Sequence, residues 1–203
     1  MISQPIIDLV RLNSFHRLWT AAWHMEAKCT QGAQPWVAIE SNHFNNFALW
    51  HEEDVARRDD IPAEKVRAAK RNIDRFNQAR NDAMEKIDDW ILGTLIKRSD
   101  VPPSGLAHSE TLGMMIDRLS IMALKEYHMA EQAVRQDAKE EHRQKCAARV
   151  AVLQEQQRDL TEALRVLLDD ILAGRRCFKL YRQFKMYNDP ALNPQLYIQH
   201  KPK

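Results

Sequence analysis

The chain has 203 residues, and its 30 basic side chains nearly balance 28 acidic ones. Because the two signs interleave along the chain, the composition argues against a nucleic-acid-binding surface, and no run approaches the roughly 20 apolar residues that a membrane span needs. The length suits one domain with its own core, and three widely separated cysteines in no CxxC pair favour reduced thiols in a cytoplasmic protein without a signal peptide.

The pattern of apolar residues predicts an all-α fold. Only five glycines occur, and no alternating run of β-branched residues indicates a strand. Pro35 and Pro62 suit the first turns of helices, and Gly174 suits a helix C-terminal cap. We therefore expect a single domain, residues 1–203, built as an antiparallel bundle of about five helices. The predicted helices cover residues 5–26, 35–58, 62–97, 109–135 and 138–173, and an irregular aromatic C-terminal strap follows at 176–199.

The predicted second helix carries a line of polar residues. Their spacing alternates between four and three, which places them along one face of a helix. Because polar groups are costly to bury without partners, this face is typical of a binding site or of a buried polar network. Its residues are Ile39, His43, Asn46, Trp50, Glu53 and Arg57.

Two further helices add charged groups. Arg80 interrupts the apolar stripe of the predicted third helix, so it needs an anionic partner or water. On the predicted fourth helix, Asp117 and His128 share one line, whereas Arg118 and Lys125 share the next. Such groups suit an anionic ligand, because Arg and Lys bind carboxylate or phosphate and His exchanges a proton near neutral pH. If the helices face one another, one cavity is expected to gather Glu53, Arg57, Arg80, Asp117, Lys125 and His128.

Each of these residues also has a structural explanation. Glu53 and Arg57 have the spacing of a surface ion pair, which stabilises a helix by only about 0.2–0.5 kcal/mol. Arg80 and Asp117 fit a buried structural ion pair equally well. A buried His43 is more often a hydrogen-bonded core histidine than a ligand. The number of polar groups on interior stripes is what favours a functional site.

The same predicted helix also contains a possible metal-binding element. Glu40 and His43 match the Glu-x-x-His element of di-iron helical bundles. A second such element is missing, because Glu140, Glu141 and His142 have the wrong spacing. We therefore predict no metal ligands and leave the cofactor open, with a carboxylate and histidine metal-binding bundle as an alternative.

The predicted fifth helix carries a heptad pattern. Such a stripe packs within a bundle or against a second copy of the chain, so a homodimer through this face is a further alternative. The stripe consists of Cys146, Val150, Leu153, Gln157, Leu160, Leu164, Leu167 and Ile171.

Four motifs run from the second helix to the strap. They are Asn46-Phe47-x-Leu49-Trp50-His51-x-Glu53-Asp54-x-Ala56-Arg57, Asn77-x-x-Arg80-Asn81, Asp117-Arg118-Leu119-Ser120-Ile121 followed by Leu124-Lys125 and His128-Met129, and Tyr181-Arg182-Gln183-Phe184-Lys185-Met186-Tyr187-Asn188-Asp189-Pro190. At these residues the chain resembles the DUF4254 family of bacterial proteins. The resemblance implies a bacterial cytoplasmic protein whose relatives are often encoded near glycosyltransferases of envelope polysaccharide synthesis, which is an association and not a mechanism.

Together these features favour an enzyme or ligand-binding protein for a phosphorylated sugar or nucleotide-sugar in envelope polysaccharide synthesis. Whether it is an enzyme is left open. The candidate catalytic residues are Glu53, Asp54, Asp117 and His128. The predicted ligand-binding residues are His43, Asn46, Trp50, His51, Arg57, Arg80, Arg118, Lys125 and Lys185. The rival hypothesis is a non-catalytic adaptor that docks on a glycosyltransferase.

Overall fold

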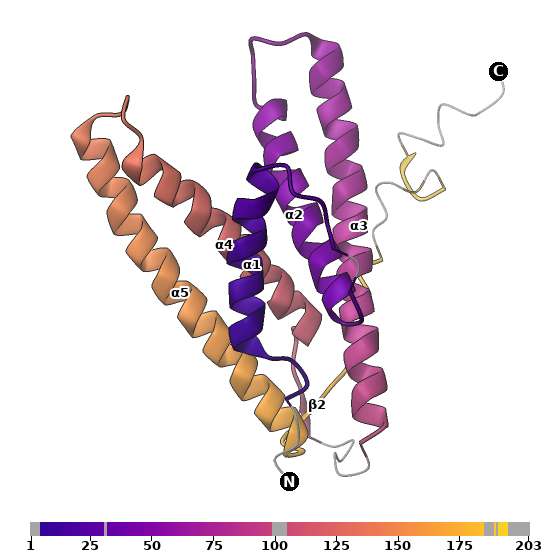
Figure 1. Cartoon of the computed structure of the whole chain (residues 1–203). Coiled ribbons are helices and arrows are strands. Elements are labelled where there is room, and N and C mark those ends of the chain that lie inside the picture. Colours follow the sequence, from indigo (N-terminus) through magenta and orange to yellow (C-terminus); the bar gives the residue numbers. More distant parts are fainter. Residues whose placement is uncertain (1–4, 31, 99–104, 185–188, 190, 195–203) are drawn as a thin grey trace, which may run out of the picture.

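The all-α prediction is confirmed by a computed structural model, which describes residues 5–30, 32–98, 105–184, 189 and 191–194 (Figure 1). Within these residues the chain forms five helices and two very short strands. The helices are α1 (Leu9–His24), α2 (Trp36–Ala56), α3 (Ala63–Ile96), α4 (Leu112–Val134) and α5 (Glu140–Leu172), and the strands are β1 (Leu106–Ala107) and β2 (Arg176–Cys177).

Two of the five helices begin at a residue whose side chain caps the first turn. The Asp8 carboxylate accepts a hydrogen bond from the backbone N–H of Arg11 at 3.0 Å, so α1 starts four residues later than the predicted residue 5. In the same way, the Thr111 hydroxyl accepts from the backbone N–H of Met114 at 3.1 Å and starts α4. Pro35 and Pro62 directly precede α2 and α3. The predicted boundaries therefore differ from the observed ones mainly at ends that a side-chain cap defines.

The bundle consists of two helical hairpins, α2–α3 and α4–α5, with α1 packed against them (Figure 1). The core lies where the five helices meet. Its fully buried members include Leu12, Ile87, Ile116, Leu119 and Leu164. Burial of each such side chain favours folding by about 1.5–3 kcal/mol. None of the helices in the described residues combines the length and apolar character needed to cross a membrane.

The heptad stripe of α5 is used inside the chain. Leu164, Leu167 and Ile171 belong to the core, and Cys146 and Gln157 are buried as well. The apolar face on which the homodimer alternative rests is therefore largely covered by the chain's own helices.

The strap after α5 is tied to the bundle at several points. β1 and β2 pair in parallel, next to Gly105, whose φ of +105° and close approach to the Arg175 backbone leave no room for a Cβ atom. Phe178 packs on the core, whereas Phe184 is 85% exposed. The Arg182 guanidinium binds Glu85 and Asp89 of α3, at 3.0 and 2.6 Å. The strap is thus held to α3 by ion pairs, but only part of it packs against the bundle. Lys185 lies outside the described residues.

Candidate metal centre

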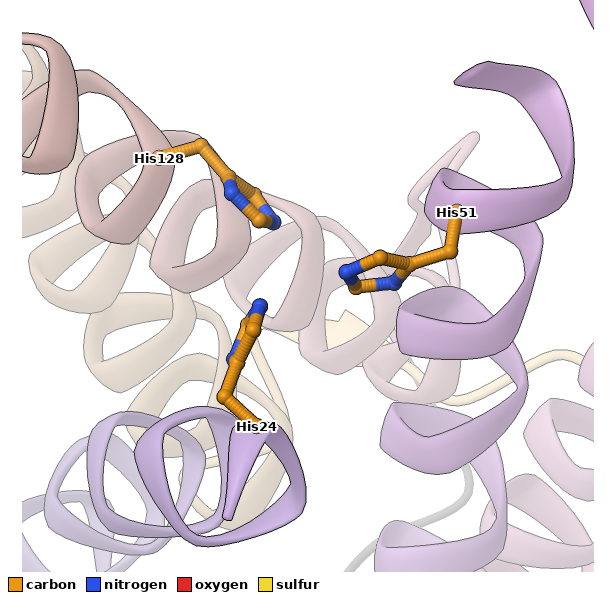
Figure 2. A group of neighbouring side chains, drawn as sticks. All are labelled: His24, His51 and His128. Carbon is orange, nitrogen blue, oxygen red and sulfur yellow. The ribbon is translucent and has the colours of Figure 1, made fainter. Parts of the chain in front are cut away.

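Three histidines from three helices meet at one point. His24 is the last residue of α1, His51 lies in the last two turns of α2, and His128 lies in the second half of α4. One nitrogen from each ring lies within 4.8 Å of the other two. Figure 2 shows that each ring turns the nitrogen farther from its backbone, Nε2, toward the common centre. The three side chains thus present a concave set of imidazole nitrogens.

Hydrogen bonds at the other ring nitrogen fix the tautomer of each histidine. The Nδ1–H of His24 donates to the Thr20 carbonyl at 2.7 Å, and the Nδ1–H of His51 donates to the Phe47 carbonyl at 2.8 Å. His128 Nδ1 lies 2.9 Å from Oε2 of Glu131, a carboxylate that accepts. A neutral imidazole with a proton on Nδ1 keeps its lone pair on Nε2. The same arrangement orients metal-binding histidines in known metalloproteins.

The centre is enclosed by aromatic side chains. Tyr127 stacks on His24 with a ring distance of 4.4 Å, and Trp50 stacks on His128 at 4.8 Å. The Nε2 atoms of His24 and His128 are buried and have no hydrogen-bond partner among the described residues. Burial lowers the pKa of His128, the Glu131 carboxylate partly opposes that effect, and the neighbouring His24 and His51 lower the pKa further. The His128 ring therefore favours the neutral, metal-binding form.

The donor set suits a divalent transition metal. Imidazole nitrogens are ligands for zinc, copper, iron and nickel, and a catalytic zinc ion commonly has three protein ligands and one open position. On a tetrahedral zinc ion, nitrogens about 2.0–2.1 Å from the metal lie about 3.3 Å from one another. The three nitrogens, now within 4.8 Å of one another, would therefore have to move closer together to bind such an ion.

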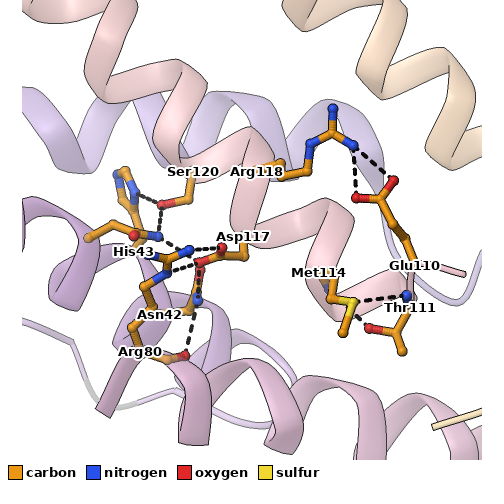
Figure 3. A network of polar contacts seen from close by, with 10 residues as sticks. Asn42, His43, Arg80, Glu110, Thr111, Met114, Asp117, Arg118 and Ser120 are labelled. Atoms are coloured by element: carbon orange, nitrogen blue, oxygen red, sulfur yellow. Dashed lines mark hydrogen bonds and ion pairs between the residues drawn. The ribbon is translucent and has the colours of Figure 1, made fainter. Parts of the chain in front are cut away.

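A second polar cluster lies deeper in the bundle, around Asp117 (Figure 3). Nε and Nη2 of Arg80 donate to its two carboxylate oxygens at 2.8 and 2.7 Å. Asn42 and Asn46 each donate from Nδ2 to Oδ1 of Asp117, at 2.8 and 2.9 Å. Asp117 is buried, so these four bonds replace the water that its charge has lost. The arrangement fits the structural ion pair better than a catalytic acid.

The cluster continues through His43 to α1. The Nε2–H of His43 donates to the His16 carbonyl at 2.8 Å, while Nδ1 accepts from the Ser120 hydroxyl at 2.7 Å. Asn46 also donates to Ser120 Oγ, at 3.0 Å, which joins the two halves. Burial lowers the pKa of His43 to about 4, and burial together with His43 lowers the pKa of His16. Both rings are therefore neutral core groups.

The network and the three-histidine centre are joined by the same three helices. In each helix a network residue precedes the histidine of the centre by eight positions, which corresponds to about 12 Å along a helix. The pairs are His16 and His24 on α1, His43 and His51 on α2, and Ser120 and His128 on α4. The buried bonds therefore hold α1, α2 and α4 in register two turns from the point where their histidines meet.

The residues expected around one cavity are separated into three groups. Arg80 and Asp117 meet in the buried network, together with His43 and Asn46. Glu53 and Arg57 form a surface ion pair at 2.9 Å, with Arg57 mostly exposed. Lys125 and His128 form the third group. Arg118, predicted as an anion ligand outside this set, turns away from the network and binds Glu110 at 2.8 Å (Figure 3). The single cavity predicted for these residues does not form, because Arg80 and Asp117 pair in the interior whereas Glu53 and Arg57 pair at the surface. Trp50, Asp54, Lys125 and His128 do line one pocket.

His24 was not predicted from the sequence as a site residue, and neither was its grouping with His51 and His128. The Glu-x-x-His element is used otherwise, because Glu40 accepts from the backbone and hydroxyl of Thr30 at 2.6 and 2.9 Å. The available signal was the repeated eight-residue spacing, which puts a histidine of the centre on the same stripe as a buried network residue in each helix.

Comparisons with known proteins give one match. A family model described as "Protein of unknown function (DUF4254)" matches residues 36–180. His51 and His128 lie inside the matched region, and His24 lies before it. No curated protein and no solved structure matches the chain.

Proposed function

The chain belongs to the DUF4254 family, and we propose that it is a metal-dependent protein. Its His24, His51 and His128 would bind a divalent transition-metal ion such as Zn²⁺. The observation that carries the proposal is that, in each of the three rings, both nitrogens are placed as they are in a metal-binding histidine. Every Nδ1 is engaged by an acceptor, and the Nε2 atoms turn toward one point (Figure 2). The Nε2 atoms of His24 and His128 are buried without a partner among the described residues, which is unfavourable unless an ion or water satisfies them.

Three histidine ligands leave a coordination position for water or a substrate. Zinc in such a site lowers the pKa of its bound water to about 7 and polarises carbonyl or phosphoryl oxygens. The proposed role is therefore catalytic rather than structural, with hydrolysis or a related addition of water as the reaction class. Glu131, which holds His128, increases the basicity of that ligand.

Metal titration of the protein tests this proposal. The metal-stripped chain is titrated with Zn²⁺ by calorimetry and with Co²⁺ by visible absorption, which reports tetrahedral coordination. We expect each of H24A, H51A and H128A to weaken binding by at least about 100-fold while circular dichroism shows an intact helical fold. The matched control is H142A, a surface histidine of α5. Equal metal affinity in all four variants and the parent would overturn the proposal.

A second candidate function, the adaptor, is favoured by one observation. Phe184 is 85% exposed and lies two residues after Arg182, which forms an ion pair with Asp89 of α3. The adaptor hypothesis requires such an exposed aromatic side chain, which a partner protein would cover. We keep a glycosyltransferase of envelope polysaccharide synthesis as the proposed partner class. Co-purification with such an enzyme that survives H128A but is lost in F184A would favour the adaptor over the metal-dependent role.

The proposed setting is the bacterial cytoplasm. Cys29, Cys146 and Cys177 are all free thiols, which is consistent with a reducing compartment. Localisation of a tagged full-length chain by cell fractionation tests this part of the proposal.

A further inference from the structure

A pocket of about 470 Å³ adjoins the three-histidine centre. It lies between one face of α2 and one face of α4, and α5 closes one side. Its lining includes Trp50, Asp54, Lys125, His128, Gln132 and Leu153. The volume is within the usual range for small-molecule sites. His128 belongs to both the pocket and the centre, so a molecule in this pocket contacts the ring of a proposed metal ligand.

The pocket contains one cation that is available for a ligand. Arg57, Arg80 and Arg118, which the sequence suggested as anion ligands, are already paired with carboxylates. Lys125 is exposed and forms no ion pair with any described residue. Its ammonium group provides three donors for a phosphate or carboxylate.

The other lining groups define the rest of the ligand. Asp54 is also outside the ion pairs of the described residues, and its carboxylate accepts hydrogen bonds from hydroxyl groups. Gln132 can both donate and accept. Trp50 and Leu153 provide an apolar wall, and the indole is held in place by its stacking on His128. A ligand that satisfies all of them has an anionic group, several hydroxyls and an apolar face.

We infer that this pocket binds a small polyhydroxylated anion of the sugar-phosphate class and places it beside the three-histidine centre. The inference rests on the proposed function, because it assigns a substrate class to that centre. A bound divalent ion adds positive charge on the far side of His128, which favours an anion in the pocket. By thermodynamic linkage, the anion favours metal binding to the same extent.

Calorimetry with three probes tests the assignment. Zn²⁺-loaded and metal-free protein are each titrated with glucose 6-phosphate, glucose and inorganic phosphate. We expect the sugar phosphate to bind at least tenfold more tightly than either of the other two, and more tightly to the Zn²⁺-loaded form. Lys125→Met should weaken binding of the sugar phosphate at least tenfold, whereas Lys145→Met, at an exposed position of α5 outside the pocket, should leave it unchanged.

The outcomes separate this inference from the proposed function. Absence of binding by the Zn²⁺-loaded protein, or equal affinity in Lys125→Met and the parent, would overturn the sugar-phosphate assignment while metal binding stands. A chain that binds no metal but still binds glucose 6-phosphate through Lys125 would overturn the metal proposal and retain the pocket. Because Lys125 is exposed, its replacement leaves the core intact, and a thermal unfolding curve confirms that the variant is folded.

Discussion

Thr20 accepts a hydrogen bond from His24 through its backbone carbonyl, at 2.7 Å, and so holds the ring whose other nitrogen faces the three-histidine centre. The hydroxyl of the same Thr20 donates to the His16 carbonyl at 2.9 Å and lies 3.1 Å from His43 Nε2. One residue therefore belongs to both the candidate centre and the buried network. Disturbance of the network is expected to reach the centre through α1.

The carboxylate of Glu131 gives a first prediction about the centre. Glu131→Gln should weaken Zn²⁺ binding by about 10- to 100-fold, because a neutral amide supports the His128 imidazole less well than a carboxylate does. Glu155→Gln, at an exposed position on α5, is the control and should bind as the parent does. Calorimetric titration of both variants measures the difference. An affinity of Glu131→Gln equal to that of the control would argue against this role for Glu131.

The Arg80–Asp117 pair gives a prediction about stability. Arg80→Met leaves the Asp117 carboxylate buried with only amide partners, which is expected to cost about 3–5 kcal/mol of unfolding free energy. Replacing both residues, as Arg80→Met with Asp117→Leu, should recover part of that loss because no charge is then left unpaired. Urea unfolding of the two variants and the parent measures these changes. An Arg80→Met variant within about 0.5 kcal/mol of the parent would contradict a structural role for the pair.

The buried histidines predict sensitivity to acid. The pKa of His43 is about 4 in the folded chain, below the usual 6.5, because burial disfavours its charged form. Its contribution to stability is therefore complete above about pH 6.5 and is lost as the pH falls toward 4, by about 1.4 kcal/mol per pH unit. The lowered pKa of His16 acts in the same direction.

A matched variant isolates this effect from other groups. Burial raises the pKa of Asp88 to about 6, which acts in the opposite direction because protonation of that carboxyl favours the folded state. The comparison is therefore between the parent and His43→Asn, with urea unfolding at pH 7, 6 and 5. We expect the gap in stability between them to narrow as the pH falls. A constant gap across this range would contradict the lowered pKa of His43.

The fold could be predicted from the sequence because its causes are local. Apolar residues at helical spacing, few glycines and prolines at helix starts determine five helices whatever their partners are. A lone Arg80 in an apolar stripe likewise requires an anion, and Asp117 supplies it.

The site could not be predicted as well, because it depends on how helices are rotated against each other. Asp117 of α4 binds Arg80 of α3 and Asn42 of α2, whereas Arg118, the next residue, lines a pocket together with residues of α5. His24 joins His51 and His128 only through that packing.

Two glycines with opposite surroundings give the last prediction. A Cβ atom at Gly113 would lie 2.7 Å from the Met84 carbonyl oxygen and 2.8 Å from the Asp88 carboxylate, which itself accepts from the Gly113 N–H at 2.7 Å. Gly113→Ala must therefore push α4 away from α3, and we expect it to lower the free energy of unfolding by about 1–3 kcal/mol.

Gly93 lies inside α3 with nothing within 4 Å of an added Cβ. Gly93→Ala should instead stabilise the chain by about 0.5–1 kcal/mol, because alanine is the better helix former. Thermal unfolding should thus move the midpoints of the two variants in opposite directions, and a shift of the same sign in both would contradict the close α3–α4 contact at Gly113.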